Sequence, residues 1–218
     1  MTTSTLGFTV SLACDEADLA DARHVRVAGY GHHGMGEALR APDEVDYLPE
    51  SAVFIARDKA TGQAVGTVRV QRRGRRRLLL EECIALPPEI GEDHCAEIAR
   101  LAAIPGADPL VKVTLMKATF LECLAGQVQW MVIGARSNAL VRVYKRLCFH
   151  DLFGGEPVPL SYAGGLPHRV LAFNVQTAER TWMDAGNGLY DFMFKTWHPD
   201  LCIHARRGIQ HLPLPMAA

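Results

Sequence analysis

Apolar side chains recur at helical spacing in several segments of the chain. Residues 16–29 carry them among charges, and Asp15 stands at the position of an N-cap, which predicts an amphipathic helix. Residues 110–125 repeat the spacing with a more apolar composition, and Gly126 is expected to end that helix. Further helices are expected over residues 138–147 and 177–195.

Runs typical of strands are shorter. Residues 51–57 and 64–71 flank a turn-forming stretch, which predicts a hairpin near the start of the chain. Residues 128–134 are almost wholly apolar and suit a strand that is buried on both faces. Two more strands are expected over residues 96–103 and 168–175. This order predicts a mixed α/β sheet flanked by helices, within one domain over residues 1–218.

Composition narrows the class of protein. Hydrophobic residues make up 49% of the 218 residues and charged residues 22%, which is ordinary globular usage and excludes disordered, fibrous and membrane classes. No apolar run approaches the roughly 20 residues that span a bilayer, and the first residues resemble no signal peptide, so a cytoplasmic protein is expected. A net charge of −1 gives no general attraction to nucleic acid. The six cysteines form no C-x-x-C pair, so we expect reduced thiols and no metal site. No bound cofactor is expected either.

One short segment departs from this even charge. Five arginines occupy six positions directly after the second expected strand: Arg72, Arg73, Arg75, Arg76 and Arg77. A cluster of this density attracts an acidic partner. The alternative interpretation is a solvated arm of the hairpin.

Two motifs on expected strands resemble a known superfamily. Residues 97–102, Glu-Ile-Ala-Arg-Leu-Ala, are similar to the Glu-x-x-Arg strand of the acyl-homoserine-lactone synthases and of the FeeM-like N-acyl amino acid synthases, which are GNAT-type acyltransferases. Residues 66–69, Gly-Thr-Val-Arg, resemble the strand of those enzymes that ends in arginine. The resemblance implies a GNAT-like fold.

Two further matches lie before the hairpin. Asp43 and Asp46 reproduce the Asp-x-x-Asp spacing of an acidic loop in those synthases. Arg26 and Tyr30 reproduce an Arg-x-x-x-aromatic step at the end of the first helix. The tryptophan that usually follows in the lactone synthases is absent from residues 32–36, which favours the branch that acylates amino acids.

Two segments depart from the GNAT pattern. Residues 144–149 are similar to the Tyr-x-x-x-Gly-Phe end of the GNAT core, but Cys148 replaces the glycine. Residues 104–110 stand where coenzyme A dependent enzymes carry a glycine-rich loop whose backbone N–H groups bind the pyrophosphate. Two prolines remove donors there, and Asp108 adds like charge. Acyl carrier protein, which is small and acidic, is therefore the expected acyl donor, with acyl-CoA as the alternative.

Aminolysis of a thioester needs a base for the amine proton and dipoles for the oxyanion. The resemblance implies Glu97 as the base, with Arg69 and Arg100 as supports or as ligands of a carbonyl or carboxylate. Strand alternation places Glu97 and Arg100 on opposite faces, so the resemblance also implies a bulge near them. The alternative is a buried ion network of these three residues with Asp43 and Asp46.

The acceptor and the acyl chain need binding residues of their own. Asp43 and Asp46 are candidates for holding the acceptor's ammonium group, or else they cap a loop. The resemblance assigns Arg26 and Tyr30 to substrate binding as well. An apolar channel for the acyl chain is expected from Leu101, Met116, Phe120, Trp130 and Phe149. The alternative for each of these is plain core.

The function expected from the sequence is transfer of a medium or long acyl chain from acyl carrier protein to the amine of an amino acid. Within the same fold, the alternatives are an acyl-homoserine-lactone synthase and an acyl-CoA-dependent N-acetyltransferase. A different class of function is a non-catalytic module that binds an acyl group.

Overall fold

The computed structural model describes residues 1–31, 39–90 and 94–203, and they form two compact units. Unit 1 comprises residues 1–70, 100–122 and 197 onward, and unit 2 comprises residues 71–99 and 123–196. Strands β4 (Ala64–Arg72) and β5 (Cys95–Ala103) each run from one unit into the other. The expectation of a single domain stays a prediction.

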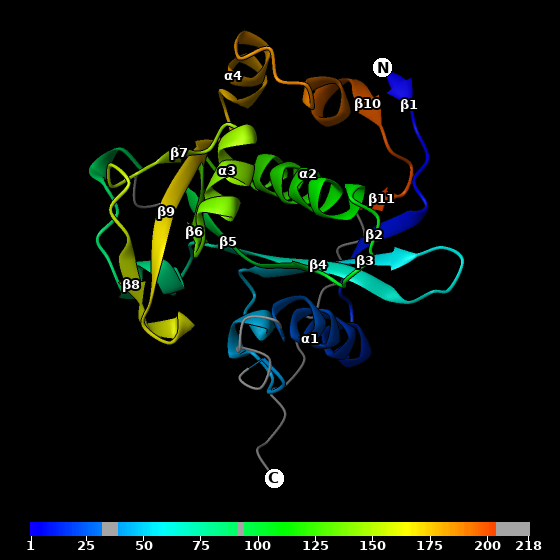
Figure 1. The fold of residues 1–218 in the computed structure, drawn as a ribbon, viewed down its shortest axis with the longest axis horizontal. Helices are drawn as coiled ribbons and strands as arrows, with labels where there is room; N and C mark the ends of the chain where they lie inside the picture. Colours follow the sequence, from blue (N-terminus) through cyan, green and yellow to red (C-terminus); the bar gives the residue numbers. More distant parts are fainter. Residues whose placement is uncertain (32–38, 91–93, 204–218) are drawn as a thin grey trace. The chain divides into compact units, whose positions relative to one another are not determined.

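A sheet between two helices forms unit 1, with α1 and α2 on opposite faces (Figure 1). Its strand order is β11, β2, β3, β4 and β5. Besides β4 and β5, the helices and strands of this unit are β1 (Thr2–Thr3), β2 (Phe8–Leu12), α1 (Glu16–Tyr30), β3 (Ser51–Asp58), α2 (Leu110–Ala125) and β11 (Leu201–Cys202). The last residues of α2, from Cys123 on, fall in unit 2.

Two local features fix the helices of unit 1. The carboxylate of Asp15 accepts the N–H of Asp18 at 2.9 Å, which confirms the expected N-cap of α1. On the other face, a Cβ added to Gly66 of β4 would collide with Val111 of α2. The absence of a side chain at Gly66 therefore lets α2 pack directly on the strand.

Unit 2 is a mixed sheet. Its part of β5 runs parallel to β6 (Trp130–Ala135), and β6 runs antiparallel to β9 (Leu166–Asn174). Two short strands, β7 (His150–Asp151) and β8 (Val158–Leu160), also pair with β9. The remaining elements are the helices α3 (Asn138–Arg146) and α4 (Ala178–Asp184) and the short turns η3 (Leu79–Glu82), η4 (Pro88–Ile90), η5 (Ser161–Ala163) and η6 (Asp191–Lys195). Strand β10 (Thr196–Trp197) has one residue in each unit.

Two helix ends differ from the sequence expectation. The helix expected over residues 177–195 is wrong beyond Asp184, because Gly186 takes a left-handed φ of 56° and ends α4; a separate π-helical turn follows at η6. Helix α2 does end before Gly126, but the left-handed residue is Gln127, with φ 56°. The N–H of Val128 then bonds the carbonyl of Cys123 at 2.8 Å and closes the helix.

Candidate functional site

The Glu-x-x-Arg motif lies on β5, where the backbone leaves the regular strand conformation. Arg100 has a φ of 58°, which is left-handed and uncommon for a residue with a side chain. Such a residue interrupts the alternation of side chains along a strand. The irregularity implied by the resemblance is therefore present, three residues after Glu97.

Glu97 is buried in unit 2, where 1% of its surface is exposed. Its Oε2 accepts the backbone N–H of Leu80 in η3 at 3.0 Å, and its Oε1 accepts the hydroxyl of Tyr162 in η5 at 2.8 Å. Both donors favour the ionised carboxylate over the acid. The two hydrogen bonds give the carboxylate of Glu97 a fixed orientation.

Sequence reasoning missed both partners of Glu97. Leu80 and Tyr162 lie 17 and 65 positions away along the chain, outside the motifs that carry the resemblance. The available signal was the pair of glycines directly after Ala163, which marks a turn that can hold a tyrosine in place. Gly164 and Gly165 do take left-handed φ values of 72° and 71°.

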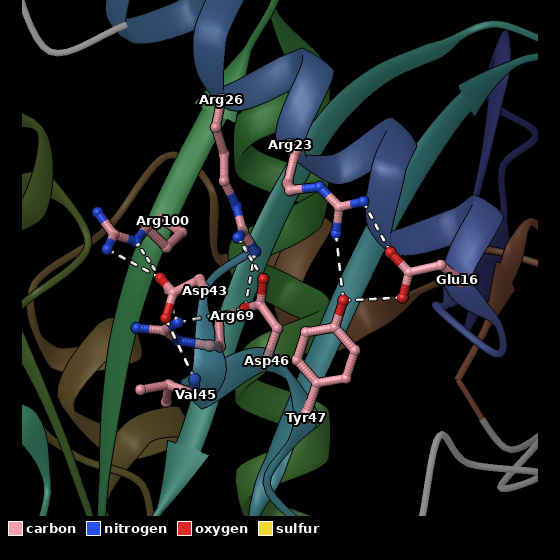
Figure 2. Close-up of polar contacts among 9 residues, drawn as sticks. All are labelled: Glu16, Arg23, Arg26, Asp43, Val45, Asp46, Tyr47, Arg69 and Arg100. Atoms are coloured by element: carbon pink, nitrogen blue, oxygen red, sulfur yellow. Dashed lines mark hydrogen bonds and ion pairs between the residues drawn. The ribbon is translucent and has the colours of Figure 1, made fainter. Parts of the chain in front are cut away.

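In unit 1 the structure brings together three arginines and two aspartates that the sequence singled out (Figure 2). Asp43 Oδ2 forms an ion pair with Nη1 of Arg69 at 2.8 Å. The same oxygen accepts a hydrogen bond from Nε of Arg100 at 3.0 Å and pairs with its Nη2 at 2.8 Å. Asp46 Oδ1 receives Nη2 of Arg26 at 3.1 Å and Nη1 of Arg69 at 3.2 Å. Arg26 Nη1 also contacts Asp46 Oδ2. We call these five residues the arginine–aspartate cluster.

The cluster carries one net positive charge, because three guanidinium groups face two carboxylates. Arg26, Asp46 and Arg69 are buried, whereas 19% of the Arg100 side chain is exposed. Burial opposes ionisation of Asp43, yet the charges of Arg69, Arg100 and Arg26 and the hydrogen bond from Arg100 hold its pKa at about 2. The ion network foreseen as an alternative is present for these five residues, and its partly exposed members are Arg100 and Asp43, at 19% and 17%.

Asp43 also has the alternative role foreseen for it. Its Oδ1 accepts the N–H of Val45 at 3.2 Å and caps the turn η2 (Glu44–Tyr47). The loop-capping interpretation is therefore confirmed for Asp43. Ammonium binding by Asp43 and Asp46 stays a prediction, and both carboxylates already accept hydrogen bonds from arginines.

Tyr30 lies at the end of α1 beside this cluster. Its hydroxyl donates to the carbonyl of Leu101 at 2.9 Å. Burial raises the pKa of Tyr30, and the charges of Arg100, Arg26 and Arg69 oppose that rise. The Arg-x-x-x-aromatic step therefore places both of its residues in the same region of unit 1.

The residues expected to line an acyl channel are divided between the two units. Leu101, Met116 and Phe120 belong to unit 1, and Trp130 and Phe149 belong to unit 2. Met116, Phe120 and Phe149 are buried, and Leu101 and Trp130 are half-buried. Their role as a channel stays a prediction.

The loop before α2 borders an open pocket of about 390 Å³ in unit 1. Its lining includes Gly29, Ala103, Ile104, Pro105, Asp108 and Lys112. The carboxylate of Asp108 accepts the N–H of Leu110 at 2.8 Å, so an acid of the chain itself occupies the start of the helix. An anion placed there would meet like charge.

The arginine run lies in unit 2 and is exposed in its second half. Arg73 pairs with Glu81 at 3.0 Å, and both are partly buried. Arg75, Arg76 and Arg77 are exposed. Within the described part of the chain, no group of three or more acidic, cysteine or histidine side chains could hold a metal ion, and no helix is long and apolar enough to cross a membrane.

Comparison with known proteins identifies the fold. No protein-family model and no curated protein sequence matches the chain. Among solved structures, FeeM, an N-acyl amino acid synthase from uncultured soil microbes, is similar with a TM-score of 0.64 at 16% identity, over 85% of this chain and 98% of that one. A probable acetyltransferase from Staphylococcus epidermidis is similar with a TM-score of 0.54 at 14% identity, over 77% and 98%.

The ribosomal-protein-S18-alanine N-acetyltransferase from Escherichia coli extends the comparison. It is similar with a TM-score of 0.51 at 14% identity, over 77% of this chain and 94% of that one. At these low identities, the comparisons establish a shared fold. The chain has the GNAT-like acyltransferase fold, a mixed sheet flanked by helices, and the expected fold class is confirmed.

Proposed function

We propose that the protein is an N-acyltransferase that transfers a medium or long acyl chain from acyl carrier protein to the amine of an amino acid. The observation that carries the proposal is the buried carboxylate of Glu97, on the strand that bears the Glu-x-x-Arg motif. Two neutral donors, from η3 and η5, bond to this carboxylate. Support also comes from the fold of FeeM, which is described as an N-acyl amino acid synthase.

In the proposed reaction, the amine nitrogen of the acceptor attacks the thioester carbon. A carbon–nitrogen bond forms, the carbon–sulfur bond breaks, and the carrier leaves as a thiolate that takes up a proton. Glu97 accepts the proton that the amine loses, directly or through water. No acyl-enzyme intermediate is required, because a thioester is reactive enough for direct aminolysis.

The charge of the arginine–aspartate cluster suits an acceptor that carries a carboxylate. Arg100 is partly exposed, and its bonds to Asp43 use Nε and Nη2. A guanidinium binds a carboxylate with good geometry, and the net positive charge of the cluster favours an anion over an ammonium group. We therefore assign the acceptor's carboxylate to Arg100, with Arg69 and Asp43 as its supports.

Two observations favour acyl carrier protein over coenzyme A as the donor. Asp108 caps the start of α2, where a coenzyme pyrophosphate would need free N–H donors. Arg75, Arg76 and Arg77 present an exposed positive surface, which complements an acidic carrier. The carrier is accordingly the proposed partner.

In the test, purified protein is mixed with the proteinogenic amino acids and with one of two donors. The donors are acyl carrier protein loaded with a long acyl chain and the matching acyl-CoA, and products are identified by mass. We expect N-acyl amino acids from the acyl carrier protein, and a loss of about 10²- to 10⁴-fold in kcat for Glu97→Gln. Glu122→Gln, which alters another buried glutamate, should stay active. A product from acyl-CoA alone would overturn the donor, and a lactone product or no product would overturn the function.

A further inference from the structure

Tyr162 is one of the two described contacts of Glu97 that lie outside the sequence motifs, and it is the side-chain donor of the two. Its hydroxyl donates to Glu97 Oε1 at 2.8 Å, and its side chain is partly exposed although Glu97 is buried. The tyrosine sits in η5, on a loop that returns to β5 from a distant part of the chain. The phenol therefore occupies one of the two carboxylate oxygens of the proposed base with a hydrogen bond.

A second contact holds Tyr162 in place. The N–H of Ser161 donates to Sγ of Cys83 at 3.3 Å, and Cys83 directly follows η3, the turn whose Leu80 N–H donates to Glu97. The two turns that supply donors to Glu97 are thus joined to each other beside the carboxylate. This contact joins η5 to η3, and the hydroxyl of Tyr162 reaches Glu97 from η5.

Other ionisable groups of this region are Arg73, Glu81 and Cys95. Arg73 and Glu81 form an ion pair at 3.0 Å. Burial and the nearby charge of Glu81 raise the pKa of Cys95 to about 12, so this thiol does not titrate near neutral pH. The residue paired with Glu97 on β6 is Val132, which is apolar. Beside these groups, the hydroxyl of Tyr162 donates directly to the carboxylate of the proposed base.

We propose that Tyr162 is a positioning residue that sets the proton affinity and orientation of Glu97 through this hydrogen bond. The inference rests on the proposed function, because it takes Glu97 as the base. Donation from the phenol stabilises the carboxylate relative to the carboxylic acid. Removal of the hydroxyl therefore makes Glu97 take up a proton more readily, and the base becomes protonated at a higher pH.

The test measures the single-turnover rate of acylation as a function of pH. For Tyr162→Phe we expect the acidic limb of the profile to move by about one pH unit toward higher pH, with the rate largely recovered above it. Tyr190→Phe is the matched control, since it removes a hydroxyl that donates to the exposed Glu179 at 3.1 Å in the same unit. Its limb should stay where the wild-type limb lies.

A second substitution keeps the test decisive if Tyr162→Phe does not fold. Site-specific replacement of Tyr162 by 3-fluorotyrosine keeps the hydroxyl and makes it a stronger donor, so the limb should move to lower pH. If the wild-type enzyme is active and the acidic limb does not move in either variant, the proposed role of Tyr162 is overturned and the proposed function is not affected. A wild-type enzyme that forms no N-acyl amino acid would instead overturn the proposed function.

Discussion

At the scale of single residues, Asp43 shows how the cluster is stabilised. Three arginine charges outweigh the effect of its burial and hold its pKa at about 2, against an ordinary value of 3.8. Because this pKa is depressed on folding, the ionised carboxylate stabilises the folded state above pH 3.8. That contribution is lost as the pH falls from 3.8 toward 2.

Asp43→Asn should lower the free energy of unfolding at pH 7 by about 2 kcal/mol, because the ionised group is lost and Arg69 and Arg100 lose their shared partner. Urea unfolding at pH 7 and at about pH 3 measures the effect, and the gap between variant and wild type should narrow at the lower pH. Glu44→Gln removes the same charge from the exposed neighbouring residue and should change stability by less than about 0.5 kcal/mol. Equal losses for the two variants would contradict this account.

At the scale of elements, Cys148 holds a backbone conformation that suits glycine. It follows α3 with a φ of 63°, at the position where the GNAT pattern has glycine. The structure thus shows a left-handed residue where the pattern has glycine, which the sequence analysis did not predict. A side chain in this region costs about 1–2 kcal/mol in local conformational energy.

Cys148→Gly should raise the free energy of unfolding by about 0.5–1 kcal/mol, because relief of the left-handed conformation outweighs the extra freedom of glycine in the unfolded chain. Urea unfolding at neutral pH provides the measurement. Cys148→Ala separates the backbone effect from loss of the thiol, which receives Asn187 Nδ2 at 3.6 Å, and should give no gain. A loss of stability in the glycine variant would show that the thiol contact matters more than the backbone.

Helices and strands with a regular spacing of apolar residues were predictable from the sequence, and irregular elements were not. Helix α1 and the hairpin of β3 and β4 follow directly from their apolar spacing. Strand β2 was not assigned, although its alternation of Phe8, Val10 and Leu12 with polar residues is a strand signal. The helix expected over residues 177–195 failed because periodicity cannot reveal the left-handed turn at Gly186.

The residues of the candidate site likewise fall into those that the sequence predicted and those that it did not. The arginine–aspartate cluster was accessible to sequence reasoning because its residues belong to motifs with fixed spacing. The contacts of Glu97 with Leu80 and Tyr162 were not, since they depend on two short turns that only the folded chain brings to β5. Local pattern identifies the charged residues, whereas tertiary structure selects their neutral partners.

At the scale of the whole molecule, charge is nearly balanced, with a net value of −1. Positive charge is nevertheless concentrated at exposed positions of unit 2, in the arginine run and in Arg142, Lys145 and Arg146 on α3. Electrostatic attraction of an acidic partner to either surface would weaken with added salt.

Replacing Arg75, Arg76 and Arg77 together by glutamate should raise KM for the acyl carrier protein by at least about tenfold and leave kcat largely unchanged, because these charges steer association. Initial rates at several salt concentrations measure the effect, and the salt dependence should weaken in the variant. The same reversal at Arg142, Lys145 and Arg146 is the matched control and should leave KM near the wild-type value. A larger effect at α3 would move the docking surface there.

The most direct test of the central claim is mass spectrometry of lipid extracts from bacteria that express the wild-type protein or the Glu97→Gln variant at equal levels. The account predicts N-acyl amino acids in the wild-type extract and their loss in the variant, whose melting temperature should remain close to that of the wild type. Extracts without any N-acyl amino acid, or undiminished product from the folded variant, would contradict it.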